Sequence, residues 1–196
     1  MIQLPPPLKK GTLSVEEALW RRRSVREYAA GPLTLEEVSQ LLWSAYGITS
    51  PEGFRTAPSA MALYPLELYL AGGDVEGLPS GVYQYAAREH GLEAVREGDV
   101  RLDLAAATYG QEFVAKAASI LVFTAIYERT REAFQEAGRD YVHMDLGHAG
   151  ENVHLEAVAL DLGTVVVAAF RPAEVQRVMQ LPADHVPLYL MPVGRT

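Results

Sequence analysis

The longest regular pattern of apolar residues lies in the last third of the chain. From Tyr141 to Leu162 they follow one another at spacings of four, three, four, four and three, the period of one helical face: Val142, Leu146, Ala149, Val153, Ala157 and Leu160. Beyond Asn152 the other faces turn apolar as well. We therefore expect a long helix that ends at Gly163 and is buried on two sides.

Shorter helices are indicated by their start and stop signals. Ser14 and Glu17, and again Thr34 and Glu37, form the S/T-x-x-E signature of a capping box. They predict one short helix that leads into a run of arginines and a longer one that stops at Gly47. The other expected helical segments are 102–118, with a break at Gly110, and 172–179, which begins with a proline.

Strands are indicated where β-branched and aromatic residues run between turn residues. Segments 81–85 and 92–95 face each other across a short turn, which predicts an antiparallel hairpin. Segment 120–126 is almost continuously apolar, which is typical of a strand buried on both faces at the centre of a sheet. Further strands are expected at 66–70, at 164–170, again as a central strand, and at 186–193.

The composition fits one domain that covers residues 1–196. About half of the chain, 49%, is hydrophobic, which is enough for one sizeable core. The formal net charge of −8 argues against a broad nucleic-acid surface or an anionic membrane partner. The absence of cysteine excludes disulfides, thiolate metal sites and cysteine nucleophiles. With no apolar run of membrane-spanning length and no signal-peptide core, we expect a soluble, cytoplasmic protein.

One short run concentrates positive charge in this acidic chain: residues 21–28 read Arg-Arg-Arg-Ser-Val-Arg-Glu-Tyr. Guanidinium groups meet phosphate oxygens two at a time, and Ser24 adds a hydroxyl between arginines, so the run has the donors of a phosphate cradle. The same arginines would also complement the dipole at a helix C-terminus. The run alone leaves both interpretations open.

Other chemistry is weakly signalled. His143, His148 and His154 fall on the long helix, but spacings of five and six turn their rings apart, so no metal site is expected. His148 and Asn152, with Asp145 one turn earlier, form either a buried polar stripe or one wall of a ligand pocket. The chain has no G-x-S-x-G elbow, G-x-G-x-x-G fingerprint or Walker loop, so a bound nucleotide would be held by arginines and isolated backbone amides.

Two segments are similar to motifs of one enzyme family. Residues 22–26, Arg-Arg-Ser-Val-Arg, match R-[RH]-S-x-[RK], and residues 55–67 match R-x-x-P-S-A-G-A-L-Y-P-L-E, the more specific motif. They resemble the FMN-dependent nitroreductase superfamily, and most closely its branch of azoline (thiazole/oxazole-forming) dehydrogenases that act on ribosomal peptides. Weaker matches follow in the family's order at Gly110-Gln111, Gly147-His148 with Asn152, Ala168-Ala169-Phe170 and Val193-Gly194-Arg195.

The resemblance implies an α+β, nitroreductase-like fold, with a mostly antiparallel central sheet flanked by helices and a long central interface helix. It implies a homodimer that shares two FMN sites at its interface. A helix buried on two sides suits such an interface, because it packs on its own sheet and on its symmetry mate. The implied cofactor-binding residues are Arg22, Arg23, Ser24, Arg26, Pro58, Ser59, Ala60, Met61, Leu63, Ala168, Ala169 and Arg195.

The resemblance also implies roles for these residues. Arg22, Arg195 and Ser24 would hold the phosphate, and Arg26 would reach the N1/C2-carbonyl edge of the flavin, where positive charge stabilises the anionic reduced form. Backbone amides around Ala168-Ala169 would face N5 and O4. The 58–61 loop would come from the partner subunit or line the other edge.

The implied activity is ping-pong hydride transfer through flavin N5, with NAD(P)H as donor and a nitro, quinone or related organic compound as acceptor. A peptide azoline dehydrogenase and a non-catalytic flavin-binding homodimer remain alternatives. The dehydrogenase branch carries a catalytic Lys-Tyr pair where this chain reads Glu132-Ala133-Phe134-Gln135, so no catalytic residue is assigned. The residues that would have to stand in are Tyr64, Tyr109, Tyr127 or His148. Ala62 replaces a flavin-contacting asparagine of many nitroreductases, and Met61 replaces a glycine, which narrows the pocket.

Overall fold

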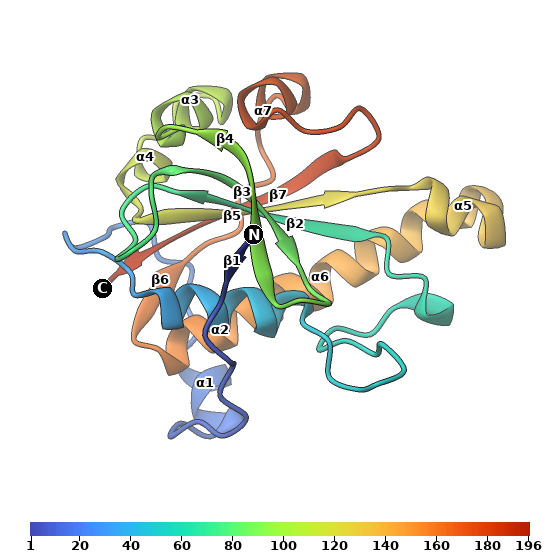
Figure 1. Ribbon diagram of the computed structural model, residues 1–196, viewed down its shortest axis with the longest axis horizontal. Coiled ribbons are helices and arrows are strands. Elements are labelled where there is room, and N and C mark those ends of the chain that lie inside the picture. The colour runs from blue at the N-terminus through green and yellow to red at the C-terminus, as the bar shows by residue number, and fades with distance from the viewer.

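Helices cover both faces of a seven-stranded antiparallel sheet in the computed structural model, which describes residues 1–196 (Figure 1). The strands are β1 (Ile2–Gln3), β2 (Leu66–Gly72), β3 (Gly81–Ala86), β4 (Gly91–Glu97), β5 (Ser119–Ala125), β6 (Leu162–Thr164) and β7 (Val186–Arg195), in the spatial order β1-β4-β3-β2-β5-β7-β6. The helices are α1 (Val15–Arg21), α2 (Leu35–Tyr46), α3 (Arg101–Ala107), α4 (Phe113–Lys116), α5 (Glu128–Phe134), α6 (Gly138–Ala159) and α7 (Pro172–Met179), with short 3-10 turns η1 (Ala60–Ala62) and η2 (Gln135–Ala137). The expected α+β fold is confirmed.

The continuous apolar run of β5 is explained by burial on both sides. β5 pairs with β2 and with β7 in the middle of the sheet. Leu121 and Phe123 belong to the hydrophobic cluster beneath α2 and α6, whereas Ile120 and Val122 belong to the cluster beneath α3 and α7. Because successive side chains point to opposite faces, both sets must be apolar.

The long helix α6 forms most of one layer and packs against α2. It spans 22 residues, and Val142, Ala149 and Val153 on its inner face are fully buried. The helix was expected at 141–162, so both of its ends differ from the expected ones by three residues. At the C-terminal end it stops before a left-handed turn at Asp161 (φ 55°), and Gly163 lies in β6.

The predicted hairpin of β3 and β4 is confirmed, and so is the helix that begins at Pro172. The strand expected in the centre of the sheet at 164–170 is wrong. Only Leu162–Thr164 forms regular pairs, as the edge strand β6, and beyond it Val167 makes a single bridge to Leu190. The β-branched run is buried because it packs against α7 and β7. Its apolar side chains therefore do not show that the segment pairs with a strand on each side.

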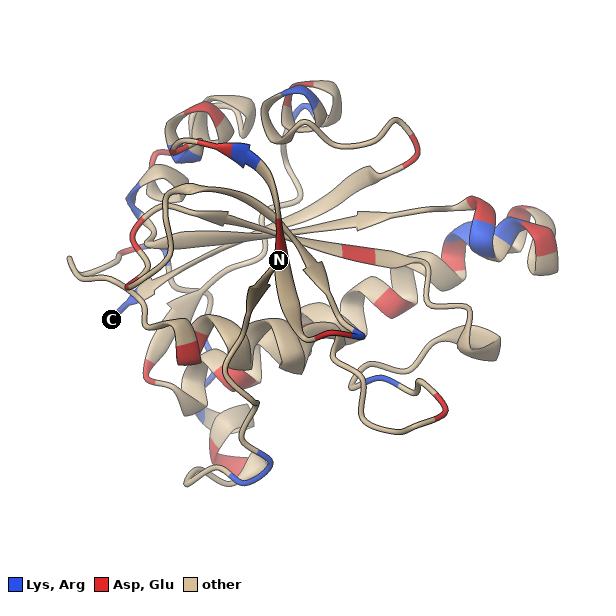
Figure 2. Cartoon of the chain, viewed as in Figure 1, with Lys and Arg blue, Asp and Glu red and all other residues tan.

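Charged residues lie mainly on the outer helices and loops, whereas most of the central sheet carries none (Figure 2). Lys and Arg are scattered in this view and gather on no broad face. None of the helices has the length and apolar character needed to cross a lipid bilayer.

Candidate functional site

The arginine run lies beside the sheet edge formed by β6 and β7. The amide of Val25 donates to the carbonyl of Thr164 (2.9 Å), and the amide of Ala29 donates to the carbonyl of Arg195 (3.0 Å). This close approach requires Gly163, where a Cβ atom would lie 2.6 Å from Cγ1 of Val25. The run therefore has a fixed extended course after α1 ends.

The extended course separates the cations of the run into two sets, because alternate side chains point to opposite sides. The side chains of Arg22, Ser24 and Arg26 make no hydrogen bond or ion pair within the chain, and all three are at least partly exposed. Arg21 binds Glu17 (3.3 Å) and lies 3.6 Å from Asp161. In the same run, Arg23 donates to the carbonyl oxygens of Trp20 (3.1 Å) and Arg22 (2.7 Å).

Arg21 thus fits the helix-end interpretation, and the phosphate cradle stays a prediction for the other residues of the run. Arg21 is the basic residue in the last turn of α1, as a helix-end cation should be. Arg22, Ser24 and Arg26 form a row of unused donors, which we call the cation row. Arg23, predicted with them, is turned away and partly occupied, so its cofactor role stays an unsupported prediction.

Behind the row lies a cavity of about 230 Å³ bounded by Arg21, Arg23, His154 and Thr164 among others. His154 is only 7% exposed, and its Nδ1 has no partner. Burial, with a smaller contribution from the charge of Arg22, lowers the pKa of His154 to about 4. The imidazole is therefore neutral near pH 7.

Arg195 does not complete the cation row. Its Nη1 lies 2.6 Å from Oε1 of Glu37 and its Nη2 lies 2.8 Å from Oε2, and Nε and Nη2 also donate to the carbonyl of Pro32. With its donors directed to these groups, the guanidinium has little capacity left for a phosphate. The expected phosphate role of Arg195 is corrected to a structural one.

The Ala168-Ala169 step follows the bridge of Val167 to Leu190 and is exposed. The amides of both alanines are free of backbone partners, while the carbonyl of Ala169 accepts from Nε2 of Gln111 (3.2 Å). Two adjacent free amides on a strand end are suitable donors for a ligand carbonyl or ring nitrogen.

The loop of residues 58–64, which we call the motif loop, has an unusual backbone. Met61, Ala62 and Tyr64 all have positive φ values, 50°, 54° and 47°. Such values favour glycine, which explains why the family motif has glycine where this chain has Met61. The amide of Tyr64 donates to Oγ of Ser59 (3.0 Å), and Arg129 donates to the carbonyl of Tyr64 (2.9 Å).

The other residues of the motif loop face outward or support it. Pro58 and Met61 are exposed, and Met61 is 75% exposed, so its side chain is free to cover a ligand. Ser59, Ala60 and Leu63 are partly exposed. The amides of Ser59, Ala60 and Met61 have no backbone partner. The motif loop therefore offers the amides of Ser59 and Met61 as donors, whereas the amide of Ala60 faces Asp145.

Asp145 of α6, expected in a buried polar stripe or in one wall of a ligand pocket, lies beneath the motif loop. It is 3% exposed, and its Oδ2 has no partner. Burial raises its pKa, while the hydroxyl of Ser59, the charge of His148 and the amide of Ala60 oppose that rise. Its sequence signal was the i, i+3 spacing to His148, which is exposed on the same helix.

The four candidate proton donors lie in different places. Tyr64 belongs to the motif loop, and Tyr109 is exposed near Ala169, with the guanidinium of Arg171 5.2 Å from its ring. Tyr127 is paired with His143 (2.8 Å), and His148 is exposed on α6. No single residue is therefore singled out as the proton donor.

The cation row and the motif loop lie at opposite ends of α6. Asp145 supports the motif loop, whereas His154 and Ala157 bound the cavity behind the cation row. The twelve residues from Asp145 to Ala157 correspond to roughly 18 Å of helix at about 1.5 Å per residue. In Figure 1 the turquoise loop before β2 and the C-terminus next to β6 accordingly lie on opposite sides of the molecule. A single chain thus does not bring the cation row and the motif loop together.

Comparisons with known proteins identify the family of the chain. A model of the nitroreductase family matches residues 19–195. A provisionally named nitroreductase of Methanocaldococcus jannaschii is 45% identical over 183 residues, which cover 93% of this chain and 91% of the relative. A solved structure from Ralstonia eutropha JMP134, also provisionally named a nitroreductase, is 32% identical and superposes with a TM-score of 0.87 over 100% of this chain and 89% of that chain. The trifolitoxin operon protein TfxC of Rhizobium leguminosarum bv. trifolii is 32% identical over 110 residues, 48% of this chain and 31% of TfxC.

The antiparallel sheet, the long helix and the donor rows at its two ends define a protein of the nitroreductase type. The chain belongs to the nitroreductase family. The family resemblance is therefore confirmed, and with it the expected class, an FMN-dependent oxidoreductase.

Proposed function

We propose that two copies of the chain hold FMN between them and use it to carry hydride from NADH or NADPH to a small nitro, quinone or related organic acceptor. One observation carries the proposal: the cation row and the motif loop lie at opposite ends of α6 and are both open. A two-fold axis near the middle of α6 would bring the motif loop of one copy to the cation row of the other.

The outer face of α6 supports such a dimer. Met144, Gly147, His148 and Glu151 are exposed along it, and Leu155 is half-buried. The protomer thus leaves a stripe of small, apolar and polar residues uncovered between the cation row and the motif loop. Gly147 has open space around it, so a partner helix is able to approach closely there.

The free donors match the chemical groups of FMN. Arg22 and Ser24 would bind its phosphate, and Arg26 would place positive charge near the pyrimidine edge. The amides of Ala168 and Ala169 would donate to the ring, and the motif loop of the partner subunit would exclude water from it. When bound, FMN supplies the centre that accepts and releases hydride, so the chain needs no nucleophile of its own.

The dimeric site is tested by placing a large charged side chain on the exposed stripe. Gly147→Arg keeps the protomer folded, because nothing lies within 4 Å of that position, but it should prevent dimer formation and reduce FMN content. Ala173→Arg, on the exposed face of α7, is the matched control and should remain a yellow dimer. A Gly147→Arg protein that is a monomer and keeps FMN would contradict the shared site.

The activity is tested on the purified, flavin-loaded protein under anaerobic conditions. NADH or NADPH should bleach the flavin absorption, and steady-state rates with a nitro or quinone acceptor should give parallel double-reciprocal plots. A protein that stays colourless after incubation with FMN would remove the enzyme proposal. A yellow protein that neither nicotinamide bleaches would favour a flavin-binding dimer without nicotinamide turnover.

A peptide azoline dehydrogenase is the second candidate. It is supported by the motif segment at 55–67 and by the partial match to TfxC. Arg139 and Tyr141 stand near the start of α6, but the adjacent Lys-Tyr pair expected of that branch is absent. Oxidation of a model thiazoline peptide by the flavin-loaded protein, with release of the corresponding thiazole, would move the proposal to this reaction.

A further inference from the structure

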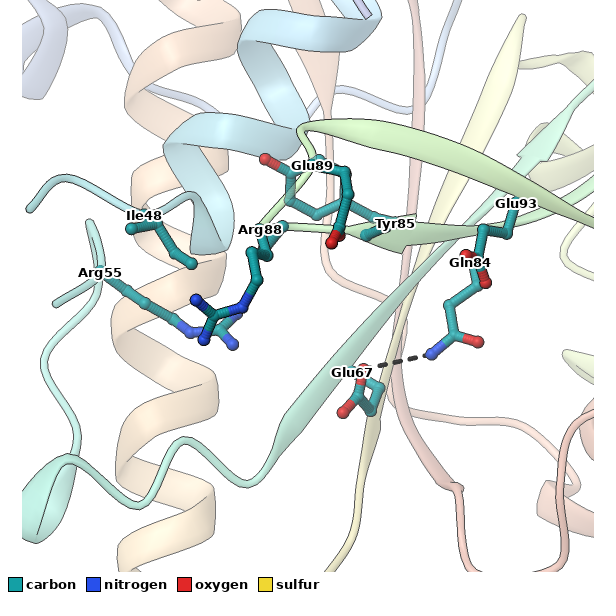
Figure 3. Close-up of a pocket in the computed structure, with 10 residues that line it drawn as sticks. Ile48, Arg55, Glu67, Gln84, Tyr85, Arg88, Glu89 and Glu93 are labelled. Carbon is teal, nitrogen blue, oxygen red and sulfur yellow. Dashed lines mark hydrogen bonds between the residues drawn. The ribbon is translucent and has the colours of Figure 1, made fainter. Parts of the chain in front are cut away.

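A separate pocket of about 220 Å³ opens between the loop after α2, the start of β2 and the turn from β3 to β4 (Figure 3). Its polar lining consists of Arg55, Glu67, Gln84, Tyr85, Arg88, Glu89 and Glu93. Arg55 and Glu67 are the first and last residues of the family motif at 55–67, but the pocket shares no residue with the cation row, the motif loop or the Ala168-Ala169 step. Its ligand therefore need not be the cofactor.

Arg55 is fixed in this pocket with most of its donors unused. Its guanidinium carbon lies 4.3 Å from the ring centre of Tyr46 and 5.1 Å from that of Tyr64, and Nη1 donates to the carbonyl of Tyr46 (3.2 Å). Nε is buried without a partner. A buried donor without an acceptor costs free energy, so an acceptor from a ligand would be stabilising.

No protein group neutralises Arg55. Burial raises the pKa of Tyr46 and of Tyr85, so both phenols stay neutral beside it. Neither Arg55 nor Arg88 forms an ion pair with any carboxylate. Figure 3 shows Arg88 extending from the β3–β4 turn toward the side of the pocket that Arg55 lines. Two like charges in this position are stabilised by an anion between them.

The other end of the pocket is negative. Oε1 of Glu67 is bound by Arg129 (2.6 Å) and Oε2 accepts from Gln84 (3.2 Å), whereas Glu89 and Glu93 form no ion pair. Figure 3 places Gln84 and Glu93 away from the arginine end. A bare anion would therefore meet attraction at one end and repulsion at the other. A ligand with charges of both signs satisfies both ends.

We propose that this pocket binds a small α-amino acid as its zwitterion. The carboxylate lies between Arg55 and Arg88, in the bidentate contact that guanidinium groups make with carboxylates, and the ammonium group faces Glu93. The cavity of about 220 Å³ is below the usual range of about 300–1,000 Å³ for larger ligands, which favours a small amino acid. Binding at this site requires no flavin and does not depend on the proposed redox function.

The proposal is tested by calorimetry and by amide chemical shifts with four probes: L-alanine, propionate, propylamine and inorganic phosphate. L-Alanine should bind with a dissociation constant on the order of a millimolar and shift the amides of Gln84 and Ala87. Propionate should bind about tenfold more weakly, and propylamine more weakly still. Tighter binding of propionate or phosphate than of L-alanine would overturn the zwitterion assignment.

Variants of exposed residues separate binding from folding. Arg88→Gln should weaken L-alanine binding about tenfold, and Glu93→Gln should weaken it about threefold while leaving propionate binding unchanged or stronger. Arg177→Gln, on the exposed side of α7, is the matched control. Equal binding of L-alanine by wild type and Arg88→Gln, or no binding by the wild-type protein, would overturn the proposal.

Discussion

Arg195, at the end of β7, forms a two-point ion pair with Glu37 in the first turn of α2, with N···O distances of 2.6 and 2.8 Å. The same Glu37 closes the capping box of α2 by accepting from the amide of Thr34 (2.8 Å). The pair is largely shielded, with side-chain exposures of 31% for Arg195 and 16% for Glu37. It therefore ties the last strand to the start of a core helix.

Arg195→Ala should lower the free energy of unfolding by about 2 kcal/mol, because a half-buried carboxylate is left without its cation. Its affinity for FMN should change little. Urea unfolding followed by circular dichroism measures the first quantity, and FMN titration of the folded variant measures the second. A large loss of FMN affinity with unchanged stability would restore Arg195 to the phosphate site.

Arg22→Ala should weaken FMN binding by about 10- to 100-fold, because it removes a charge-assisted contact to the phosphate. Riboflavin lacks the phosphate, so its affinity should be nearly unchanged in the same variant. Arg23→Ala is the matched control, since its guanidinium already donates to the carbonyls of Trp20 and Arg22. If Arg22→Ala weakens both flavins equally, Arg22 contacts the ring or supports the fold instead.

Local signals in the sequence predicted much of this structure. The capping box of Thr34 and Glu37 and the proline at 172 each determine where a helix starts. Because these interactions form between residues close together in the chain, they can be read from the sequence. The run at 120–126 likewise reports burial on two faces directly. The proposal of an anion site at the arginine run rests on the resemblance of this run to a family motif.

The failures concern partners that are far apart in sequence. Arg195 and Glu37 are separated by 158 positions, so no pattern within a segment reveals that the expected phosphate ligand is already engaged. The β-branched run after Thr164 lies at the edge of the sheet and is buried by α7. A segment buried in this way has the same apolar composition as a central strand.

Gly163→Ala should displace the arginine run from the sheet edge. The new Cβ would lie 2.6 Å from Cγ1 of Val25 and 2.8 Å from Cγ2 of Thr196, so the Val25 to Thr164 hydrogen bond would be disturbed. We expect a loss of about 1–3 kcal/mol in stability, as for other overpacking changes, and weaker FMN binding. Gly11→Ala, where no atom lies within 4 Å, is the control, and both are measured by urea unfolding and FMN titration. Identical behaviour of the two variants would contradict this packing argument.

His154 should make the protein less stable in mild acid. Its pKa in the folded protein is about 4, below the ordinary value of 6.5, so the unfolded chain takes up the proton first as the pH falls. The stability that neutral His154 contributes to the folded protein is therefore fully present above pH 6.5 and is lost as the pH falls toward 4. Between pH 7 and 5 the loss should be about 1–2 kcal/mol, since water in the adjacent cavity screens part of the effect.

The comparison of wild type with His154→Asn isolates the effect of His154 on the pH dependence of stability. The raised pKa values of Asp145 and Glu156 favour the folded state in acid, and this effect is present in both proteins. Urea unfolding at several pH values should show a smaller loss of stability in acid for His154→Asn. Parallel pH profiles for the two proteins would place the acid sensitivity elsewhere.

Met61→Gly should relieve the left-handed backbone of the motif loop without removing a core contact, since Met61 has φ of 50° and is 75% exposed. The gain from relaxed backbone, about 1–2 kcal/mol, is partly offset by the greater flexibility of glycine in the unfolded chain, so stability should rise by at most about 1 kcal/mol. The functional effect should be larger. Removal of a flexible side chain from the loop that covers the proposed flavin site should lower KM for bulky acceptors more than for small ones. Met61→Ala removes most of the side chain but keeps the Cβ atom, so the strain of the left-handed backbone remains. If this variant changes KM without changing stability, the effect on KM comes from the opened pocket. Equal KM values in all three proteins would place the acceptor away from Met61.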